Sequence, residues 1–160
     1  MSFFLSTKGQ LHPYNFRYLE GDFEKARLER TEIRTEKKLP LSLPIEQSDF
    51  FAIDVMAKPA HTMNIDVPLV KVRDLMKDKG IRHIPLVVNQ KIQGMISDRD
   101  LLKVDMSVTF SFLKAEDIMT TVLIVALEET PLAHVARVLM EEKISCLPII
   151  DKNHLLVGMI

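Results

Sequence analysis

The feature that most constrains the fold of this chain is an internal repeat that keeps one register across residues 51–160. Asp54-Val55-Met56 returns as Asp117-Ile118-Met119, Pro68-Leu69 returns as Pro131-Leu132, and Ile81 and Pro85 return as Ile144 and Pro148, each 63 residues later. Gly94-Met95-Ile96 returns as Gly158-Met159-Ile160 at a spacing of 64, which indicates one residue inserted in the turn between. Independent chance matches would not keep this register, so the chain contains two copies of one structural unit.

Each copy begins with a strand and a helix. The apolar runs 61–65 and 122–127 are typical of strands, and an amphipathic helix follows each. In the first copy we expect Asp66 to cap this helix, Pro68 to lie in its first turn and Gly80 to end it. The stripes expected to face the core are Leu69, Val72, Leu75 and Met76 in the first copy and, after Thr130 and Pro131, Leu132, Val135, Ala136 and Leu139 in the second.

Two further strands complete each copy. They span 81–88 and 91–97 around the turn Asn89-Gln90, and 145–151 and 155–160 around Lys152-Asn153. In the first copy a last helix starts near Asp98 and runs through Leu102, whereas the sequence stops at Ile160 before an equivalent helix. Because that helix would cover apolar sheet surface, we expect these 160 residues to be part of a longer polypeptide that completes a second S/T-x-x-D.

Residues 1–50 do not share the repeat. Residues 23–38 are dense in charges of both signs, and the prolines of 39–44 are typical of a linker. Aromatic side chains could anchor this segment to the main body: Phe3, Phe4, Tyr14, Phe16 and Tyr18. A partly ordered arm or oligomer contact and a flexible extension both remain open. We expect an arm at 1–50, a first unit at 51–112 and a second, incomplete unit at 113–160.

Composition disfavours several classes of protein. Lys and Arg number 21 and Asp and Glu 22, so the formal net charge of −1 does not favour a nucleic-acid or membrane-surface binder. The single cysteine, Cys146, excludes an internal disulfide and a cysteine-cluster metal site and favours a reducing cytoplasm. The start lacks the pattern of a signal peptide, and no run approaches the ~20 apolar residues of a membrane span.

One stretch, residues 94–100, carries candidate binding chemistry. Gly94 permits a close backbone approach, and Met95 offers an apolar wall to the face of a base. Ser97 stands where a strand hands over to a helix, so its hydroxyl and the amides behind it favour an anion. Asp100 lies one helical turn further on and can accept hydrogen bonds from two ribose hydroxyls.

The order, spacing and duplication of these elements resemble a tandem pair of CBS domains, also called a Bateman module, over about residues 51–160. The resemblance implies an α+β fold of two β-α-β-β-α units packed sheet to sheet around a pseudo-twofold axis, with the second unit lacking its last helix. It implies two clefts that bind adenine-containing ligands such as AMP, ADP, ATP, S-adenosylmethionine or cyclic dinucleotides. Such pairs usually regulate an attached or partner protein and often dimerise.

By the same resemblance, the base pocket that faces Met95, Ser97 and Asp100 comes from the second unit. Its residues are Val122, Leu123, Ile144, Ser145, Cys146 and Pro148. The resemblance places Arg82 and His83 at the rim of the second cleft, near a phosphate. It implies no required cofactor, and an adenine nucleotide is the expected regulatory ligand.

Plainer interpretations of these residues stay open. Ser97 can be a simple N-cap, Asp100 a partner of the helix dipole and Arg82 a surface residue. Asp98 and Asp100 alone supply too few ligands for a metal, and Cys146 is expected to be a small buried hydrophobe, not a nucleophile. The histidines have no metal-binding spacing: His12, His61, His83, His134 and His154. We therefore expect no metal site and no catalytic residue.

Two functional hypotheses remain, and neither is enzymatic, because the sequence has no Walker loop, dinucleotide-binding glycine motif, nucleophile elbow or zinc-protease motif. One is a ligand-sensing module in which a nucleotide alters an unknown effector protein or the chain's own dimer. The other is a structural or dimerisation scaffold with degenerate clefts. Val70 and Val138, beside the helix stripes, predict a homodimer built on helix faces. We expect at most one nucleotide per 160-residue chain.

Overall fold

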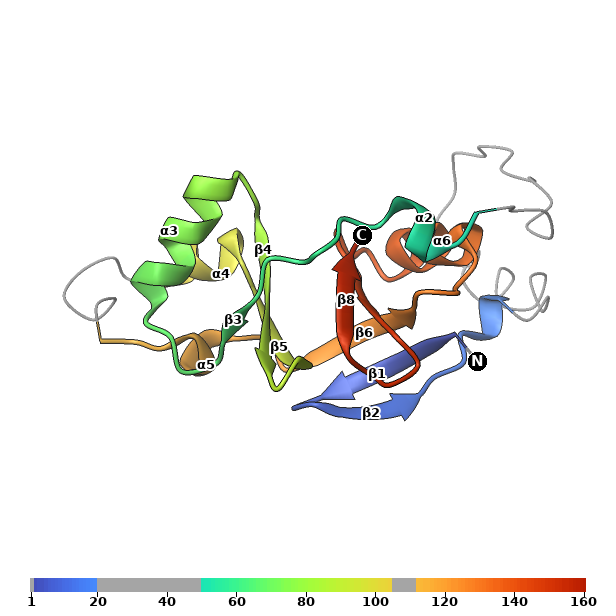
Figure 1. Ribbon diagram of the computed structural model, residues 1–160, viewed down its shortest axis with the longest axis horizontal. Coiled ribbons are helices and arrows are strands. Elements are labelled where there is room, and N and C mark those ends of the chain that lie inside the picture. The colour runs from blue at the N-terminus through green and yellow to red at the C-terminus, as the bar shows by residue number, and fades with distance from the viewer. Residues whose placement is uncertain (1, 20–49, 105–111) are drawn as a thin grey trace, which may run out of the picture.

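Two β-sheets, each flanked by helices, lie next to one another along the long axis of the protein (Figure 1). The computed structural model describes residues 2–19, 50–104 and 112–160. The three-stranded sheet has the order β3-β4-β5, with bounds Met63–Asn64, His83–Val88 and Lys91–Ser97. The five-stranded sheet has the order β2-β1-β6-β7-β8, with bounds Gln10–Pro13, Phe3–Thr7, Val122–Leu127, Pro148–Ile150 and Leu156–Met159.

The helices cover the outer faces of these sheets and confirm the predicted α+β fold. The longest are α3, Leu69–Lys79, in the first unit and α6, Leu132–Glu141, in the second. α4, Asp98–Lys103, follows β5 as predicted. The shorter elements are η1, Arg17–Leu19, before the repeats, α2, Ala52–Val55, at the start of the first repeat, and α5, Ala115–Ile118, at the start of the second. In the described part of the chain, no helix combines the length and apolarity that a membrane crossing requires.

The stripe of α3 forms the core of the first unit. Leu69 and Val72 are fully buried and Met76 nearly so, as predicted, while Leu75 is half-buried at the edge of the same cluster. Gly80 ends the helix in the left-handed region, with φ of 64°, which also confirms the prediction.

The predicted cap of α3 at Asp66 is wrong. Pro68 occupies the N-cap position, and the amide of Leu69 donates to the carbonyl of Leu113 at 3.0 Å. The chain leaving the first unit therefore supplies the acceptor that the side chain of Asp66 was expected to supply. A contact between residues so far apart in the sequence is not visible in local capping patterns.

The stripe of α6 is rotated relative to the prediction. Val135 and Val138 are fully buried, Leu132 and Leu139 are half-buried, and Ala136 is exposed. The prediction that Ala136 faces the core and that Val138 lies outside it is therefore wrong. A helix can bury positions three apart as readily as positions four apart, and here the larger valine takes the core position. Val138 is consequently unavailable as a dimer contact.

The turn between the last two strands differs in length between the two units, in agreement with the extra residue that the repeat spacing indicates. Asn89 and Gln90 both have positive φ, 50° and 63°, and form the two-residue turn between β4 and β5. In the second unit the turn is longer, and the carboxylate of Asp151 accepts from the amides of Asn153 and Leu155, both at 2.8 Å. This side chain replaces the strand pairing that the extra residue removes.

The hydrophobic core of each unit is completed by the segment with which the other repeat begins. Ala52 and Met56 are buried in the second unit's core, and Ala115 is buried in the first unit's core. The chain after α2 pairs Ala57 with β8, and the chain after α5 pairs Thr120 with β5. Figure 1 shows the result, with α2 beside α6 and α5 beside the first sheet.

Glycines permit these two crossings. A Cβ atom on Gly94 would lie 2.9 Å from the carbonyl oxygen of Thr120, and one on Gly158 would lie 3.1 Å from that of Ala57. The backbone pairing of Met95 with Thr120, at 3.0 and 2.9 Å, needs this close approach. The close approach expected at Gly94 is thus present, and the repeat places a second one at Gly158.

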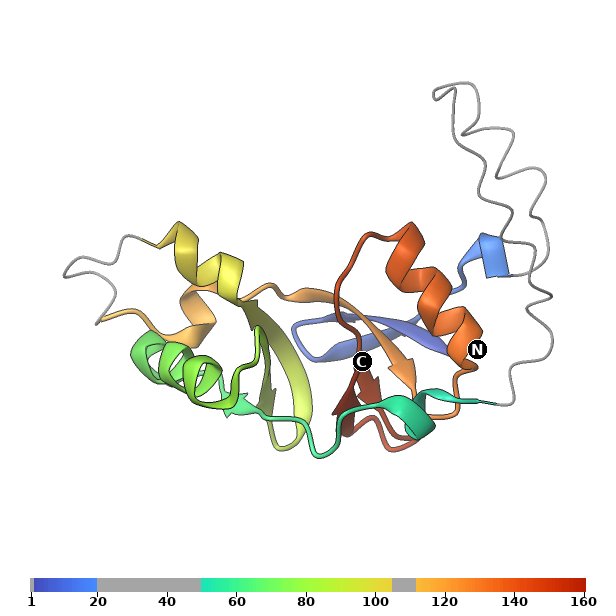
Figure 2. The same cartoon turned by 90° about the horizontal axis from the view of Figure 1, so that it is seen from above.

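The start of the chain forms a hairpin that extends the second sheet. β1 pairs antiparallel with β6, from Phe3 opposite Ala126 to Thr7 opposite Val122. The hydroxyl of Thr130 donates to the carbonyl of Ser2 at 3.0 Å, which fixes the beginning of β1. Figures 1 and 2 show the hairpin turn reaching toward β5 of the first unit. The charged run and the proline-rich segment of 20–49 lie outside the described residues.

We expect the exchanged segments to stabilise the whole molecule. Met56 belongs to the first repeat in sequence but is 8% exposed in the second unit's core, so Met56→Ala should lower the free energy of unfolding by about 2–5 kcal/mol. Met140→Ala is the matched control, because Met140 is 69% exposed and its loss should cost less than about 0.5 kcal/mol. Urea unfolding measures both, and equal effects would contradict the exchange.

Candidate functional site

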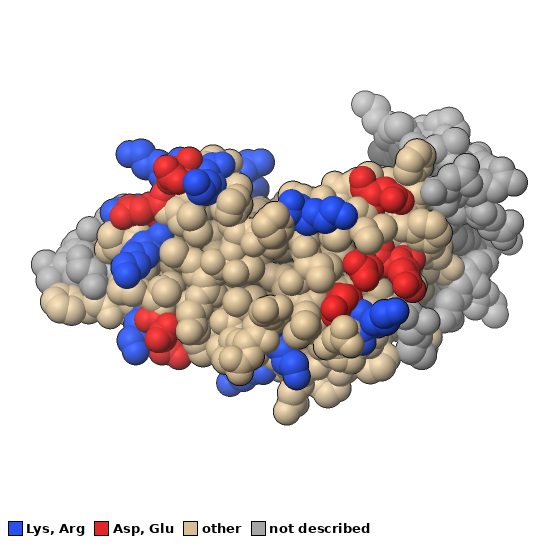
Figure 3. Space-filling view, in the orientation of Figure 1, with Lys and Arg blue, Asp and Glu red and all other residues tan. Residues whose placement is uncertain are grey.

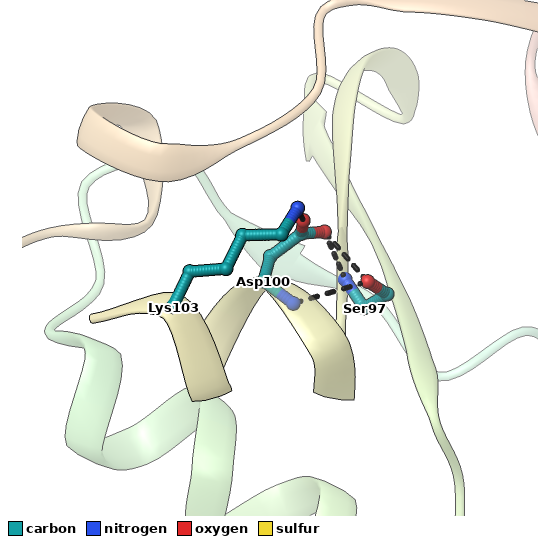
Figure 4. A network of polar contacts seen from close by, with 3 residues as sticks. All are labelled: Ser97, Asp100 and Lys103. Atoms are coloured by element: carbon teal, nitrogen blue, oxygen red, sulfur yellow. Dashed lines mark hydrogen bonds and ion pairs between the residues drawn. The ribbon is translucent and has the colours of Figure 1, made fainter.

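The candidate site lies at the junction of β5 and α4. The amide of Ser97 donates to Asp100 Oδ2 at 3.0 Å, and the hydroxyl of Ser97 donates to the same oxygen at 2.6 Å. In return, the amide of Asp100 donates to Ser97 Oγ at 3.3 Å. Lys103 Nζ lies 3.0 Å from Asp100 Oδ1 (Figure 4). This capping box matches the N-cap interpretation and also fixes both motif side chains in one orientation.

Asp100 is an ionised acceptor in this network. Burial by itself raises the pKa of the carboxyl group, but the hydrogen bonds from Ser97 and Lys103 outweigh burial and hold the pKa below its usual range. The Asp100 side chain is 19% exposed and that of Lys103 is 76% exposed. A partly buried carboxylate that stays ionised can accept, but not donate, hydrogen bonds.

Next to the network of Ser97, Asp100 and Lys103, one face of the first sheet points toward the second unit. His83 pairs with Ser97, and Pro85 pairs with Met95, across the antiparallel β4–β5 ladder. Cross-strand partners and alternate residues of a strand share a face, so these four side chains point the same way. The opposite face carries the fully buried Ile96, which packs into the first unit's core.

Side chains of the second unit meet that face. Ser145 Oγ lies 3.3 Å from His83 Nε2, and Cys146 Sγ lies 3.7 Å from Met95 Sδ. Leu123 is buried in a central cluster against which Met95 also packs. The structure therefore brings Met95, Leu123, Ser145 and Cys146 close to one another, with His83 beside them.

The remaining predicted site residues lie near the contact between the two units or in the adjoining core. Val122 is 59% exposed at the start of β6, two residues after the Thr120 that pairs with Met95. Pro148 is buried in β7, and Ile144 packs partly buried against the second unit's core. Arg82 is exposed, and its carbonyl accepts from the amide of Asp98 at 2.9 Å, next to the start of α4.

Burial keeps the two reactive side chains of this region uncharged. It lowers the pKa of His83, which favours a neutral imidazole at neutral pH. It also raises the pKa of the Cys146 thiol to about 11, so the thiolate form is scarce. Within residues 2–19, 50–104 and 112–160, no three His, Cys, Asp or Glu side chains cluster as a metal site requires. The arrangement is suited to binding: an ionised acceptor, a neutral imidazole and apolar surface.

Charged side chains lie mainly toward the two ends of the face shown in Figure 3. Acidic and basic side chains are interspersed there, and the middle of the face is mostly uncharged. A hollow of about 320 Å³ elsewhere in the structure is lined by residues of the N-terminal hairpin region and α6 and contains none of the predicted site residues. Its lining is Ser2, Phe3, Tyr14, Asn15, Phe16, Leu19 and His134.

Sequence reasoning missed Lys103. Its signal was available in principle, because a lysine three residues after an aspartate on a helix reaches that carboxylate. The contact between His83 and Ser97 was also missed, since it depends on the register of β4 against β5.

Comparison with known proteins matches this geometry. The CBS domain family matches residues 52–107 and 115–160, which are the two repeats. The chain belongs to the CBS domain family. A homoserine O-acetyltransferase of Methanococcus vannielii is 33% identical over 109 residues, 67% of this chain and 22% of that protein. The chain therefore spans about a fifth of the length of the curated relatives it matches.

Solved structures of CBS pairs share the fold. The CBS domain pair of protein MJ0100, in complex with 5′-methylthioadenosine and S-adenosyl-L-methionine, is 27% identical, with a TM-score of 0.62 over 69% of this chain and 88% of that one. CBSX2 of Arabidopsis thaliana, in complex with AMP, is 25% identical, with a TM-score of 0.62 over 69% and 89% of the two chains. The chain is thus a tandem CBS pair, and both similar structures hold adenosine ligands.

The capping box gives a prediction about stability and pH. Ser97→Ala should lower the free energy of unfolding by about 1 kcal/mol through loss of the cap. The lowered pKa of Asp100 means that its stabilisation is present above the unfolded pKa of about 3.9 and is lost as pH falls through the folded pKa. Asp100→Asn should therefore be less stable than wild type near neutral pH, and the difference should disappear in acid.

Urea unfolding at several pH values measures this difference. Asp78→Asn is the control, since Asp78 is an exposed carboxylate of α3 whose ion pair with Lys79 is at the surface. A difference between wild type and Asp100→Asn that stayed constant as the pH is lowered from neutral into acid would show that the capping box does not form in solution.

Proposed function

We propose that this CBS pair is a regulatory, non-catalytic module that binds one adenine-containing ligand per chain between its two units. The observation that carries the proposal is the contact between the units beside the motif. Met95 and His83, on the same sheet face as Ser97, meet Cys146 and Ser145 of the second unit. AMP, ADP, ATP and S-adenosylmethionine are the candidate ligands. Support comes from the adenosine ligands held by two structures of the same fold.

The geometry offers a separate partner to each part of such a ligand. Asp100 is an ionised acceptor suited to ribose hydroxyls, with Ser97 beside it. Met95 and the exposed Val122 offer apolar surface to a base. The proposed ligand-binding residues are Met95, Ser97, Asp100, Val122, Leu123, Ile144, Ser145, Cys146 and Pro148. Arg82 and His83 are proposed to contact phosphate at the neighbouring, second cleft.

The signal is proposed to be a change in how the two units pack. A ligand that contacts both units favours one relative position of them, in proportion to its difference in affinity for the two positions. Because the exchanged segments connect each unit to the other, a shift at the cleft reaches α2 and α5. The effector protein is unknown, and the single, half-buried Cys146 is consistent with a reducing, cytoplasmic setting.

The alternative is a scaffold with degenerate clefts. It is favoured by the closed network in which Ser97 and Asp100 already satisfy one another without a ligand. In this alternative, the hydrogen bonds between Ser97 at the end of β5 and Asp100 of α4 serve only to stabilise the fold. The functional contact is then made elsewhere on the protein. Binding measurements separate the two functions directly.

Loss of the ribose acceptor should weaken nucleotide binding. Asp100→Ala should bind AMP with an affinity lower by about 1.5–3 kcal/mol, because hydrogen bonds to a charged group are lost. Isothermal titration calorimetry measures the affinity, and wild type should show one AMP per chain. Asp74→Ala, an exposed carboxylate of α3, is the control. AMP that binds both variants equally, or does not bind wild type, would support the scaffold.

A homodimer is a further part of the proposal, and it now rests on α2. Val138 is buried, but Phe51, Ile53 and Val55 are 42%, 37% and 47% exposed around this short helix. Contiguous apolar exposure of this kind marks an interaction surface. Light scattering at micromolar concentration should give twice the chain mass of 18.3 kDa.

The variant Val55→Asp should shift the protein toward the monomer. Leu102→Asp is the matched control, since Leu102 is also apolar, 82% exposed and lies on α4 of the other unit. A monomeric mass for the unmodified chain would contradict the homodimer. A loss of dimer in both variants to the same extent would place the interface outside α2.

A further inference from the structure

Lys103 lies outside the Gly-Met-Ile-Ser-x-x-Asp stretch, yet its ammonium group occupies the ribose acceptor. Lys103 Nζ is 3.0 Å from Asp100 Oδ1, and the Lys103 side chain extends from the last turn of α4 back toward β5 (Figure 4). The side chain is 76% exposed, so burial does not hold it in this position. It is free to exchange one partner for another.

The two oxygens of the Asp100 carboxylate have different partners. Oδ2 accepts from both the amide and the hydroxyl of Ser97, at 3.0 and 2.6 Å. Oδ1 contacts Lys103. A carboxylate has about four lone-pair sites, two on each oxygen, so Oδ2 is filled by Ser97. Two ribose hydroxyls must therefore bind largely at Oδ1, where the lysine stands.

Displacing the lysine from Oδ1 is easy. An ion pair with one highly exposed partner is screened by solvent and restricts a long side chain, so it stabilises the protein little. The lysine backbone stays fixed in α4, and the displaced ammonium group remains beside the bound ribose. The 5′ substituent is attached to the same five-membered ring as the hydroxyls, within the reach of a four-carbon side chain.

Further charged side chains lie near the site. Arg82, Arg99, Asp98 and Asp100 all act electrostatically on His83, which pairs with Ser97. The ammonium group of Lys103 contacts Asp100 directly. When ribose hydroxyls bind to Asp100 Oδ1, the ammonium group of Lys103 loses this partner. An anionic 5′ group of the ligand then gives the ammonium group a new ion-pair partner.

We propose that Lys103 is a specificity-determining residue that exchanges Asp100 for the 5′ anionic group of the ligand. The exchange selects phosphate-bearing adenine nucleotides over adenosine ligands whose 5′ group is neutral or cationic. This inference rests on the proposed function, because it assigns the ligand class of the same cleft.

Calorimetric titration with AMP and with 5′-methylthioadenosine tests it. The two ligands share the base and the ribose hydroxyls and differ in the charge of the 5′ group. Lys103→Met should weaken AMP binding by about fivefold to tenfold and leave 5′-methylthioadenosine binding equal or slightly stronger. Lys103→Arg should retain most of the preference for AMP, because it keeps the charge. Lys77→Met, an exposed lysine of α3, is the control and should change neither affinity.

The outcomes distinguish a failure of the Lys103 inference from a failure of the proposed adenine-ligand binding. If Lys103→Met changes both affinities by the same factor, Lys103 does not select the ligand, although the cleft still binds adenosine ligands. If wild type binds neither ligand, the proposed function and the selectivity both fail. The AMP affinity of wild type should also fall more steeply with added salt than that of Lys103→Met, and equal slopes would overturn the role of the ammonium group.

Discussion

The backbone pairing of Met95 with Thr120, and of Ala57 with Met159, holds the two repeats of this protein together. Each pair is made where a strand contains a glycine, and the close approach leaves no room for a Cβ atom. Each pair also brings a short helix into the opposite core, with Ala52 and Ala115 both fully buried. Neither unit has a complete core without the segment that begins the other repeat, so the candidate site lies between parts that depend on one another for stability.

This mutual dependence explains why the candidate site forms at the end of β5. The residue before the motif serine, Ile96, is anchored in the first core, and Met95 is held by the crossing chain. Ser97 and Asp100 follow directly in the chain, and the neighbouring His83 and Met95 contact Ser145 and Cys146 of the second unit. The N-terminal hairpin adds an asymmetry, because it pairs with β6 at Val122 and Leu123, whereas the described edge of β3 carries no such hairpin.

The repeat made most of the fold predictable, because hydrophobic periodicity and turn residues act locally. The bounds of β5, the turn at Asn89-Gln90 and the end of α3 at Gly80 all follow from neighbouring residues. The error at the start of α3 has a different cause, which is contact between distant segments. The cap expected at Asp66 was replaced by the carbonyl of Leu113.

The candidate site was predictable to a similar degree. Met95, Ser145 and Cys146 meet because the two repeats are equivalent and face one another. The contact of His83 with Ser145 depended on strand register, and the contact of Lys103 with Asp100 depended on which rotamer a long exposed side chain adopts. Neither register nor rotamer is fixed by residue type, so the sequence identified the motif without the groups that surround it.

The closed state of the motif sets a limit on how such a site can respond to ligand. Ser97, Asp100 and Lys103 already satisfy one another, so a ligand gains only the difference between its own hydrogen bonds and those it replaces. The pair least costly to replace is the exposed ion pair, and the pair most costly to replace is the short bond between the Ser97 hydroxyl and Oδ2. Binding can therefore leave the capping box and α4 intact while the lysine moves. A ligand that bridges the units without unfolding either of them acts on their relative packing, which is the property that a sensor of this architecture can transmit.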